Sequence, residues 1–218
     1  MIMKKYPVIL FDLDGTLTDP AEGITNAIQY ALKKFGIEVT DKKELYKFIG
    51  PPLKDAYREY YGFTPQQCAD GIIYFREYFE EKGWKENKPI EGVFEMLQTL
   101  KERGKRLMIA TSKPEKFARK IAEHFGMAKY FEFIGGATID ESRVDKAEVI
   151  NYVLENCDVT DKKSVLMIGD RKHDIIGAKK AGVDGAGVLF GYGNLQELET
   201  AGAIFVAKTV AELTDYVI

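Results

Sequence analysis

The most constraining feature of the sequence is an apolar run that ends abruptly in acidic residues. Val8–Phe11 is followed by Asp12 and Asp14, and then by Gly15 and two threonines. An uninterrupted run of this kind is typical of a strand buried on both faces, as in a parallel sheet covered by helices. In open α/β sheets the ligand crevice lies outside the carboxyl ends of such strands. The pattern therefore predicts a buried strand that delivers two carboxylates to a crevice.

The composition is that of an ordinary globular chain. Of its 218 residues, 45% are hydrophobic and 30% are charged, and the formal net charge is −3. Such a chain can form one large domain, or one domain that carries a smaller insert. The weak negative charge provides no field that would attract nucleic acid or an anionic membrane. We therefore expect neither of these as a partner.

Cysteine usage and hydropathy bear on the compartment. Cys68 and Cys157 lie far apart, with no spacing suited to zinc, and are expected to be reduced, largely buried thiols. The apolar run near the N-terminus is too short for a signal peptide, and no run approaches the length that spans a bilayer. We expect a soluble, cytoplasmic protein that is a monomer or a homodimer.

Three further apolar runs resemble the first: Arg106–Thr111, Tyr130–Ala137 and Ser164–Asp170. Helical patterns lie between them, and one begins with Asp145 and Glu148 in the spacing of a capping box. Strands that alternate with helices indicate βαβ units and a parallel sheet. We expect helices over residues 92–103, 115–125, 146–157, 171–181 and 210–217, and a further strand over residues 185–191.

Residues 20–87 interrupt this alternation. Apolar residues recur there at helical spacing, and no strand-like run occurs. We therefore expect an α/β fold whose core, residues 1–19 and 88–218, is a three-layer Rossmann-like parallel sheet. Residues 20–87 are expected to form a small inserted α-helical domain. Its position directly after the first strand favours a lid over the crevice, although a helical decoration of the sheet has the same periodicity.

Polar residues follow the apolar runs or begin the helices at four places, and parallel strands would bring all four to one edge of the sheet. These places are Asp12 with Asp14, Thr111 with Ser112, Lys146, and Asp170 with Asp174. Up to four carboxylates in one crevice need a hard divalent cation with oxygen ligands. Mg²⁺ fits best, because it takes few protein carboxylates together with substrate phosphate.

Lys146 lies in the first turn of a predicted helix, where a cation opposes the helix dipole. An anion bound at that helix end would reverse the sign of this interaction. An exposed lysine that points away is the simpler interpretation, and Arg143 is a rival for the same role. The hydroxyls of Thr111 and Ser112 follow a strand and are suited to hydrogen-bonding phosphate, although hydroxyls are also common in turns.

Taken in order, these residues resemble the four motifs of the haloacid dehalogenase superfamily. The sequence DxDGT at Asp12–Thr16 resembles the first motif, and GDxxxD at Gly169–Asp174 resembles the fourth. Thr111–Ser112 and Lys146 match the second and third motifs. The resemblance spans the whole chain and is greatest to phosphoglycolate phosphatase-type members, which carry a helical cap after the first strand.

The resemblance implies a role for each matching residue. Asp12 is the nucleophile and Asp14 the general acid and base, while Thr111, Ser112 and Lys146 bind the phosphoryl group. Asp12, Asp170 and the backbone carbonyl of Asp14 bind Mg²⁺, and Asp174 supports a metal-bound water or Lys146. Thr16 is expected to hydrogen-bond within the first motif. In the inserted domain, the sequence FIGPPL resembles a cap loop that reaches the substrate, formed by Gly50, Pro51 and Pro52.

The expected function is Mg²⁺-dependent hydrolysis of small-molecule phosphate monoesters through an aspartyl-phosphate. Phosphoglycolate, a nucleoside monophosphate (5'-nucleotidase activity) and a sugar phosphate all remain candidate substrates. A phosphomutase of the β-phosphoglucomutase type is a further alternative. A phosphoacceptor domain resembling a response-regulator receiver is disfavoured, because its phosphorylated aspartate follows a later strand. An idle interaction protein is disfavoured because Asp12, Asp14, Lys146 and Asp170 are all intact.

Overall fold

The computed structural model describes residues 6–140 and 142–218. The chain divides into two compact units. One is formed by the residues up to Thr18 together with Pro89–Ile218, and the other by Asp19–Lys88. Residues 1–5 of the predicted core domain lie outside the described residues. The two units are described separately below as the sheet unit and the helical unit.

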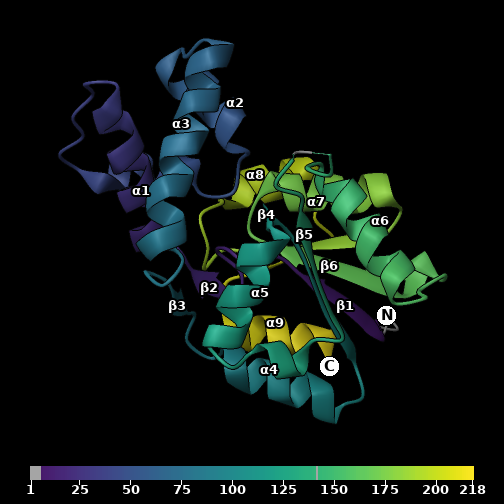
Figure 1. Ribbon diagram of the computed structural model, residues 1–218. Helices are drawn as coiled ribbons and strands as arrows, with labels where there is room; N and C mark the ends of the chain where they lie inside the picture. Colours follow the sequence, from purple (N-terminus) through teal and green to yellow (C-terminus); the bar gives the residue numbers. More distant parts are fainter. Residues whose placement is uncertain (1–5, 141) are drawn as a thin grey trace. The chain divides into compact units, whose positions relative to one another are not determined.

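The sheet unit is built on a six-stranded parallel sheet, which confirms the predicted α/β fold (Figure 1). The order of the strands is β5-β4-β1-β6-β7-β8, and every neighbouring pair is parallel. The strands are β1 (Val8–Phe11), β4 (Arg106–Pro114), β5 (Phe133–Ala137), β6 (Val165–Gly169), β7 (Asp184–Val188) and β8 (Phe205–Ala207).

Helices cover both faces of this sheet, as a three-layer fold requires (Figure 1). Three helices lie on one face of the sheet. They are α4 (Val93–Glu102), α5 (Glu115–His124) and α9 (Val210–Val217). The other face is covered by α6 (Lys146–Asn156), α7 (Lys172–Ala181) and α8 (Leu195–Ala201).

The strand order places the topological switch point at β1. Strand β4 pairs with one side of β1, and β6, which comes later in the chain, pairs with the other side. Phe11 is in register with Ile109 on β4 and with Ile168 on β6. Asp12 therefore leaves the sheet level with the residues that follow these two. In open α/β sheets this crevice at the carboxyl ends of the strands is where ligands bind.

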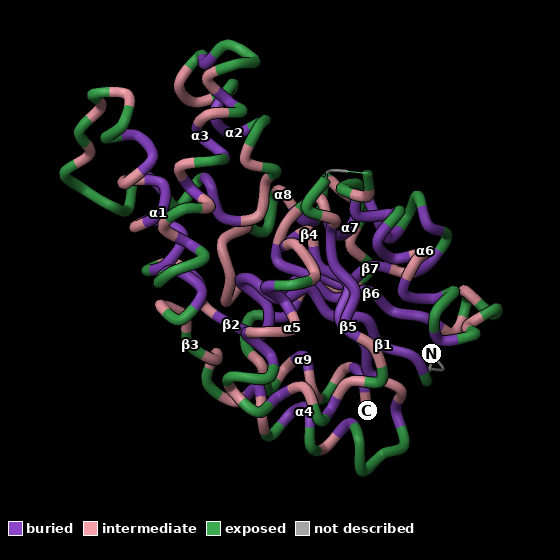
Figure 2. The backbone as a smooth tube through the Cα atoms, in the orientation of Figure 1, coloured by how far each residue is buried: buried purple, intermediate pink, exposed green. Residues whose placement is uncertain are grey.

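Burial explains why β1 reads as an uninterrupted apolar run. All four of its residues are buried, because helices cover both of its faces (Figure 2). Val8 and Leu10 pack in one cluster with Met108, Met167 and the apolar side of α6 and α7. At about 25 cal/mol per Å² of apolar surface, this buried interior is the main source of stability for the sheet unit.

Four details differ from the sequence prediction. The run Tyr130–Ala137 begins in a short 3-10 helix, Ala128–Tyr130, and only its second half is a strand. The strand expected over residues 185–191 ends at Val188, and the residues after it form a loop. The edge strand β8 and helix α8 were not predicted.

The helical unit has a core of its own. It contains α1 (Ala21–Lys34), η1 (Lys42–Phe48), α2 (Leu53–Tyr61), α3 (Pro65–Tyr78) and η2 (Phe79–Gly83). Tyr57 is fully buried, with its ring stacked on Phe63 at a centroid distance of 5.5 Å and edge-on to Phe48 at 5.3 Å. Aromatic pairs at these distances contribute beyond their buried area. Short strands β2 (Thr18–Asp19) and β3 (Lys88–Pro89) pair where the chain enters and leaves this unit.

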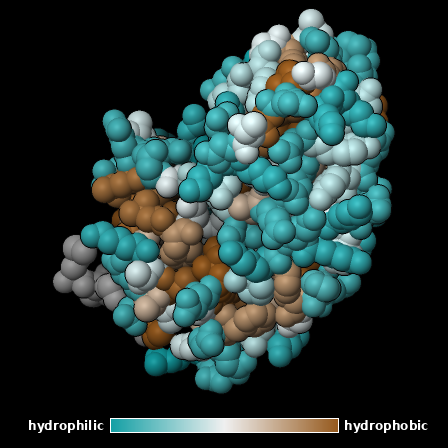
Figure 3. Space-filling model, turned by 90° about the vertical axis from the view of Figure 1, so that its left-hand side faces the viewer, coloured by the Kyte–Doolittle hydropathy of each residue, from teal (hydrophilic) through white to brown (hydrophobic). Residues whose placement is uncertain are grey.

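Hydrophilic residues dominate the face shown in Figure 3, with hydrophobic residues gathered in separate patches. This distribution agrees with the 30% of charged residues in the sequence. Among the residues that the structure describes, no helix combines the length and the apolar character needed to cross a lipid bilayer.

Candidate active site

The loop after β1 turns back on itself and leaves two carboxylates at the sheet edge. Asp12 still donates its N–H to the carbonyl of Ile168, at 2.8 Å. The chain then folds over Leu13, whose carbonyl oxygen accepts from Leu17 and Thr18. The turn requires a positive φ of 78° at Gly15, which glycine adopts without a steric cost.

Lys146 lies at the centre of the site. Its side chain is buried, and its Nζ donates to Asp12 Oδ1 at 2.8 Å and to the carbonyl of Ala110 at 3.0 Å. A third interaction joins Nζ to Asp174 Oδ1 at 2.7 Å. The unfavourable interaction between the ammonium of Lys146 and the dipole of α6 is therefore offset by two nearby anions, Asp12 and Asp174. The exposed conformation considered from the sequence does not occur.

The start of helix α6 depends on the predicted capping box. Asp145 accepts from the N–H of Ala147 at 2.8 Å, and the Glu148 side chain accepts from the N–H of Asp145 at 3.3 Å. Gly177 of α7 makes room beside this turn, because a Cβ there would lie 2.6 Å from Cβ and Cγ of Lys146. The cap and this glycine together direct the lysine side chain toward the carboxyl end of β1.

The sequence GDxxxD places two further carboxylates at the same edge of the sheet. Asp170 follows β6, and Asp174 lies in the first turn of α7, where its Oδ2 accepts from the N–H of Arg171 at 3.0 Å. Both side chains are almost fully buried. The sequence prediction that carboxylates from both ends of the chain gather here therefore agrees with the geometry.

Three of these carboxylates are arranged as a metal site would need them. Oxygen atoms of Asp12, Asp170 and Asp174 all lie within 4.8 Å of one another. Oδ1 of Asp170 is buried and has no hydrogen-bond partner among the described residues. Lys146 pairs with two of these three anions, Asp12 and Asp174. An oxygen donor set with excess negative charge and an unsatisfied buried oxygen fits a hard divalent cation.

Burial and neighbouring charges shift the pKa values of these ionisable groups. Burial raises the pKa of Asp170 well above its usual range, and repulsion from Asp174 and Asp12 adds to this. Burial also raises the pKa of Asp174 to about 6, in spite of the nearby ammonium of Lys146. Burial by itself lowers the pKa of Lys146, but attraction to Asp12 and Asp174 outweighs it and raises the value.

Asp14 does not join this cluster, because its side chain pairs with Lys113 instead. Lys113 Nζ lies 2.5 Å from Asp14 Oδ2, and both side chains are largely buried. Burial raises the pKa of Asp14, while the ammonium of Lys113 opposes that rise. The sequence analysis assigned no role to Lys113, since the two residues lie 99 positions apart and no spacing signal connects them.

The hydroxyl residues have different environments. Thr111 and Ser112 lie within β4, which continues to Pro114, and do not follow the strand as expected. Thr111 is buried and accepts from the N–H of Lys113 at 3.2 Å, whereas Ser112 is half-buried. Thr16 hydrogen-bonds within the first motif as expected, but through its backbone, since its hydroxyl has no hydrogen-bond partner within the described part of the chain. Thr16 donates its N–H to Leu13, at 3.3 Å.

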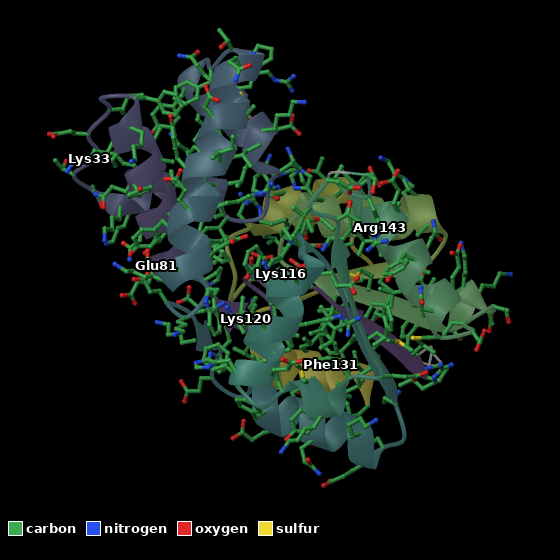
Figure 4. The ribbon with its side chains drawn as sticks, viewed as in Figure 1. Lys33, Glu81, Lys116, Lys120, Phe131 and Arg143 are labelled. Carbon is green, nitrogen blue, oxygen red and sulfur yellow. The ribbon has the colours of Figure 1, made fainter. Side chains whose placement is uncertain are left out.

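Arg143, the alternative to Lys146, belongs to a different set of contacts (Figure 4). Its guanidinium donates to the carbonyl of Gly136 at 3.0 Å and to Glu115 at 3.3 Å, and lies 3.5 Å from the ring centre of Tyr152. The predicted substrate loop, Gly50, Pro51 and Pro52, lies between η1 and α2 of the helical unit.

The charge on Asp170 is expected to affect the stability of the metal-free protein. The pKa of Asp170 is higher in the folded protein than in the unfolded chain, so its ionised form destabilises the folded state. This destabilisation is complete above the raised pKa and disappears as the carboxylate is protonated at lower pH. We expect Asp170→Asn, in a chelating buffer at pH 8, to be more stable than the wild type by about 1–3 kcal/mol. The difference should shrink toward pH 5. Calorimetry of both proteins across this range measures it, and a variant that is less stable at every pH contradicts the electrostatic account.

Comparison with known proteins agrees with this geometry. Residues 9–188 match the model of the family described as haloacid dehalogenase-like hydrolase. A predicted phosphatase from Clostridium acetobutylicum has a solved structure that superposes with a TM-score of 0.93 at 44% identity, covering 97% of each chain.

Relatives with different named activities also match. A 5'-nucleotidase from Pseudomonas aeruginosa is 44% identical over 194 residues, 89% of this chain and 87% of the relative. The tyrosine-protein kinase PtkA of Mycobacterium tuberculosis is 35% identical over 210 residues, 95% of this chain and 71% of the relative. A phosphoglycolate phosphatase from Vibrio parahaemolyticus is 28% identical over 226 residues, 100% and 98% of the two chains. The chain therefore belongs to the haloacid dehalogenase-like hydrolase family, as the sequence resemblance predicted, and is an enzyme that acts on phosphate esters.

Proposed function

We propose that this protein is a Mg²⁺-dependent phosphatase that hydrolyses small-molecule phosphate monoesters through an aspartyl-phosphate on Asp12. The observation that carries the proposal is the position of Lys146, which joins Asp12 to Asp174 in a buried cluster of three carboxylates. Carboxylates without a bound cation repel one another, so the arrangement is suited to a cation and a phosphoryl group together.

Each side chain has a proposed role in the reaction. Asp12 attacks phosphorus in line, and the ammonium of Lys146 stabilises negative charge on the phosphoryl oxygens. Asp12, Asp170 and the backbone carbonyl of Asp14 would hold Mg²⁺. Asp174 holds Lys146 in place through the contact of 2.7 Å. The bound ion supplies further charge stabilisation to the transferring group.

The remaining residues act on the leaving group and the phosphate. Asp14 protonates the leaving alcohol and then activates the water that attacks the aspartyl-phosphate. Its contact with Lys113 holds the carboxyl group in place. Thr111 and Ser112 donate hydrogen bonds to the phosphate. We further propose that the helical unit is a cap and that Gly50, Pro51 and Pro52 contact the substrate.

The substrate is proposed at two levels. The class is a small phosphate monoester, and phosphoglycolate is one candidate because of the relative with that activity. The second candidate, a nucleoside 5'-monophosphate, is favoured by the higher identity of 44% to a 5'-nucleotidase. A phosphomutase remains the alternative reaction, and it would convert glucose 1-phosphate without releasing phosphate.

A phosphate-release screen tests the proposed function. The panel contains phosphoglycolate, nucleoside 5'-monophosphates, sugar phosphates and O-phosphotyrosine, each with and without Mg²⁺. We expect release from at least one small ester, complete loss with a chelator and recovery when Mg²⁺ is restored, because the ammonium of Lys146 pairs with only two carboxylates of the cluster of three. Undiminished release in the chelator contradicts the metal assignment. Transfer of phosphate from ATP to a tyrosine peptide, without hydrolysis, contradicts the phosphatase assignment.

Asp14→Asn tests the proposed acid and base. We expect kcat to fall by about 10²–10⁴-fold, since general acid and base catalysis contributes this much. The loss in kcat/KM, which reports phosphoryl transfer to Asp12 and not the later hydrolysis of the shared aspartyl-phosphate, should depend on the leaving group. It should be smaller for p-nitrophenyl phosphate, whose leaving group needs little protonation, than for an alkyl phosphate. Steady-state kinetics with both substrates measures the difference. Equal losses with the two substrates would show that Asp14 does not protonate the leaving group.

A further inference from the structure

The two carboxylate oxygens of Asp170 have different environments. Oδ2 accepts the backbone N–H of Tyr192 at 2.7 Å. Oδ1 is buried and lacks a hydrogen-bond partner within residues 6–140 and 142–218. The side chain of Asp170 is therefore held through one oxygen, while the other remains available to a ligand. Tyr192 lies in the loop after β7, a segment to which the sequence analysis gave no function.

Glycines surround Asp170 at positions where any side chain would collide with its carboxylate or its backbone. A Cβ at Gly15 would lie 2.3 Å from Oδ2 of Asp170, and a Cβ at Gly191 would lie 2.4 Å from its Cβ. A Cβ at Gly193 would lie 1.9 Å from its carbonyl oxygen. All three distances are well inside van der Waals contact. We call the segment Gly191–Gly193 the glycine loop.

The role of glycine in this loop is to provide space. Gly15 has a positive φ and is needed for the turn as well, but neither Gly191 nor Gly193 is among the residues with positive φ. An alanine could therefore adopt the backbone conformation of the loop at both positions. Its methyl group could be accommodated only if the loop or Asp170 moved.

The glycine loop and Asp170, which meet through the Tyr192 N–H, are both connected to the start of α7. Asn194, directly after the glycine loop, caps α8 by accepting from the N–H of Glu197 at 2.9 Å. Glu197 in turn accepts from Arg171 Nε at 2.9 Å and from the N–H of Lys172 at 2.8 Å. The loop is thus tied to the residues that immediately follow Asp170, and its N–H group is held at a fixed place.

We propose that the glycine loop is a positioning element for the metal site, which fixes the Asp170 carboxylate through the Tyr192 N–H so that Oδ1 faces the ion. This inference rests on the metal site proposed above. Partners behind a metal ligand typically contribute 10–100-fold to metal affinity, because they orient the ligand atom. The loop is expected to act in this way through backbone groups, which explains why its residues carry no recognisable chemical signature.

The test measures metal binding directly. Mn²⁺ is titrated into the wild type, Gly191→Ala and Gly193→Ala, and the free ion is counted by electron paramagnetic resonance without substrate. We expect both variants to bind Mn²⁺ about 10–100-fold more weakly than the wild type. Gly187→Ala in β7 is the matched control, because its Cβ would meet the flexible side chain of Leu198 at 2.8 Å rather than Asp170. This control should lose stability and keep its affinity for Mn²⁺.

A second variant keeps the test valid if the alanine variants fail to fold. Replacing the amide of Tyr192 by an ester, with the α-hydroxy analogue of tyrosine, removes the N–H and adds no atoms toward Asp170. We expect Mn²⁺ affinity about tenfold lower in this variant. Wild-type affinity in the ester variant and in folded Gly191→Ala overturns the positioning role. Wild-type affinity in Asp170→Asn instead overturns the metal site, so the two failures are distinguishable.

Discussion

Asp12→Asn is expected to reduce phosphate release by about 10⁴-fold or more, which is the loss seen when a nucleophile is removed. Asparagine keeps the shape of the side chain but cannot form the aspartyl-phosphate. The fold should survive, because Lys146 retains its contact with Asp174 at 2.7 Å. Removing one anion from a cluster of three also lowers the repulsion among the carboxylates.

Two measurements separate loss of the nucleophile from loss of structure. The wild type, quenched during turnover, should yield a phosphorylated peptide that contains Asp12, and the variant should yield none. The melting temperatures of both proteins should be similar. Asp215→Asn, an exposed carboxylate on α9, is the matched control and should retain full activity. Residual activity above about one hundredth of the wild-type rate would reject nucleophilic catalysis by Asp12.

The sequence predicted those parts of the molecule in which local pattern and tertiary environment agree. Val8–Phe11 is apolar throughout because helices cover both faces of β1, so its burial could be inferred from composition alone. The parallel direction of the strands then follows from the alternation with helices, whereas their order in the sheet was not predicted. Once the strands are parallel, Asp12 and Asp170 must leave the sheet at the same edge, as they do.

The parts that were missed depend on contacts between distant residues. Strand β8 has only three residues and lies at the edge of the sheet, so it shows no buried apolar run. Lys113 reaches Asp14 across 99 positions. Gly191 and Gly193 resemble ordinary loop glycines until the position of Asp170 is known. The signal that could have indicated them is the glycine-rich segment directly after a strand of a parallel sheet, where a ligand crevice is expected.

Lys146→Met is expected to have the largest combined effect on stability and activity. It removes the lysine from the buried contacts with Asp12 and Asp174, and leaves both carboxylates without this partner. Breaking a buried ion pair in this way costs about 3–5 kcal/mol, or roughly 6–20 °C in melting temperature for a chain of this size. Loss of a charged donor to the phosphoryl group should lower kcat by a further 10²–10³-fold or so.

Metal dependence distinguishes the two effects of Lys146→Met. In a chelating buffer the variant should melt well below the wild type. Saturating Mg²⁺ should narrow this difference in melting temperature, because the ion offsets the buried negative charge that Lys146 no longer compensates. The loss in kcat should persist, since the ion cannot occupy the place of the ammonium that contacts Asp12 at 2.8 Å. Lys180→Met is the matched control, because it breaks an exposed pair with Asp145 that contributes at most about 1 kcal/mol. If Lys146→Met behaves like this control in both melting temperature and kcat, Lys146 neither stabilises the cluster nor binds the phosphoryl group.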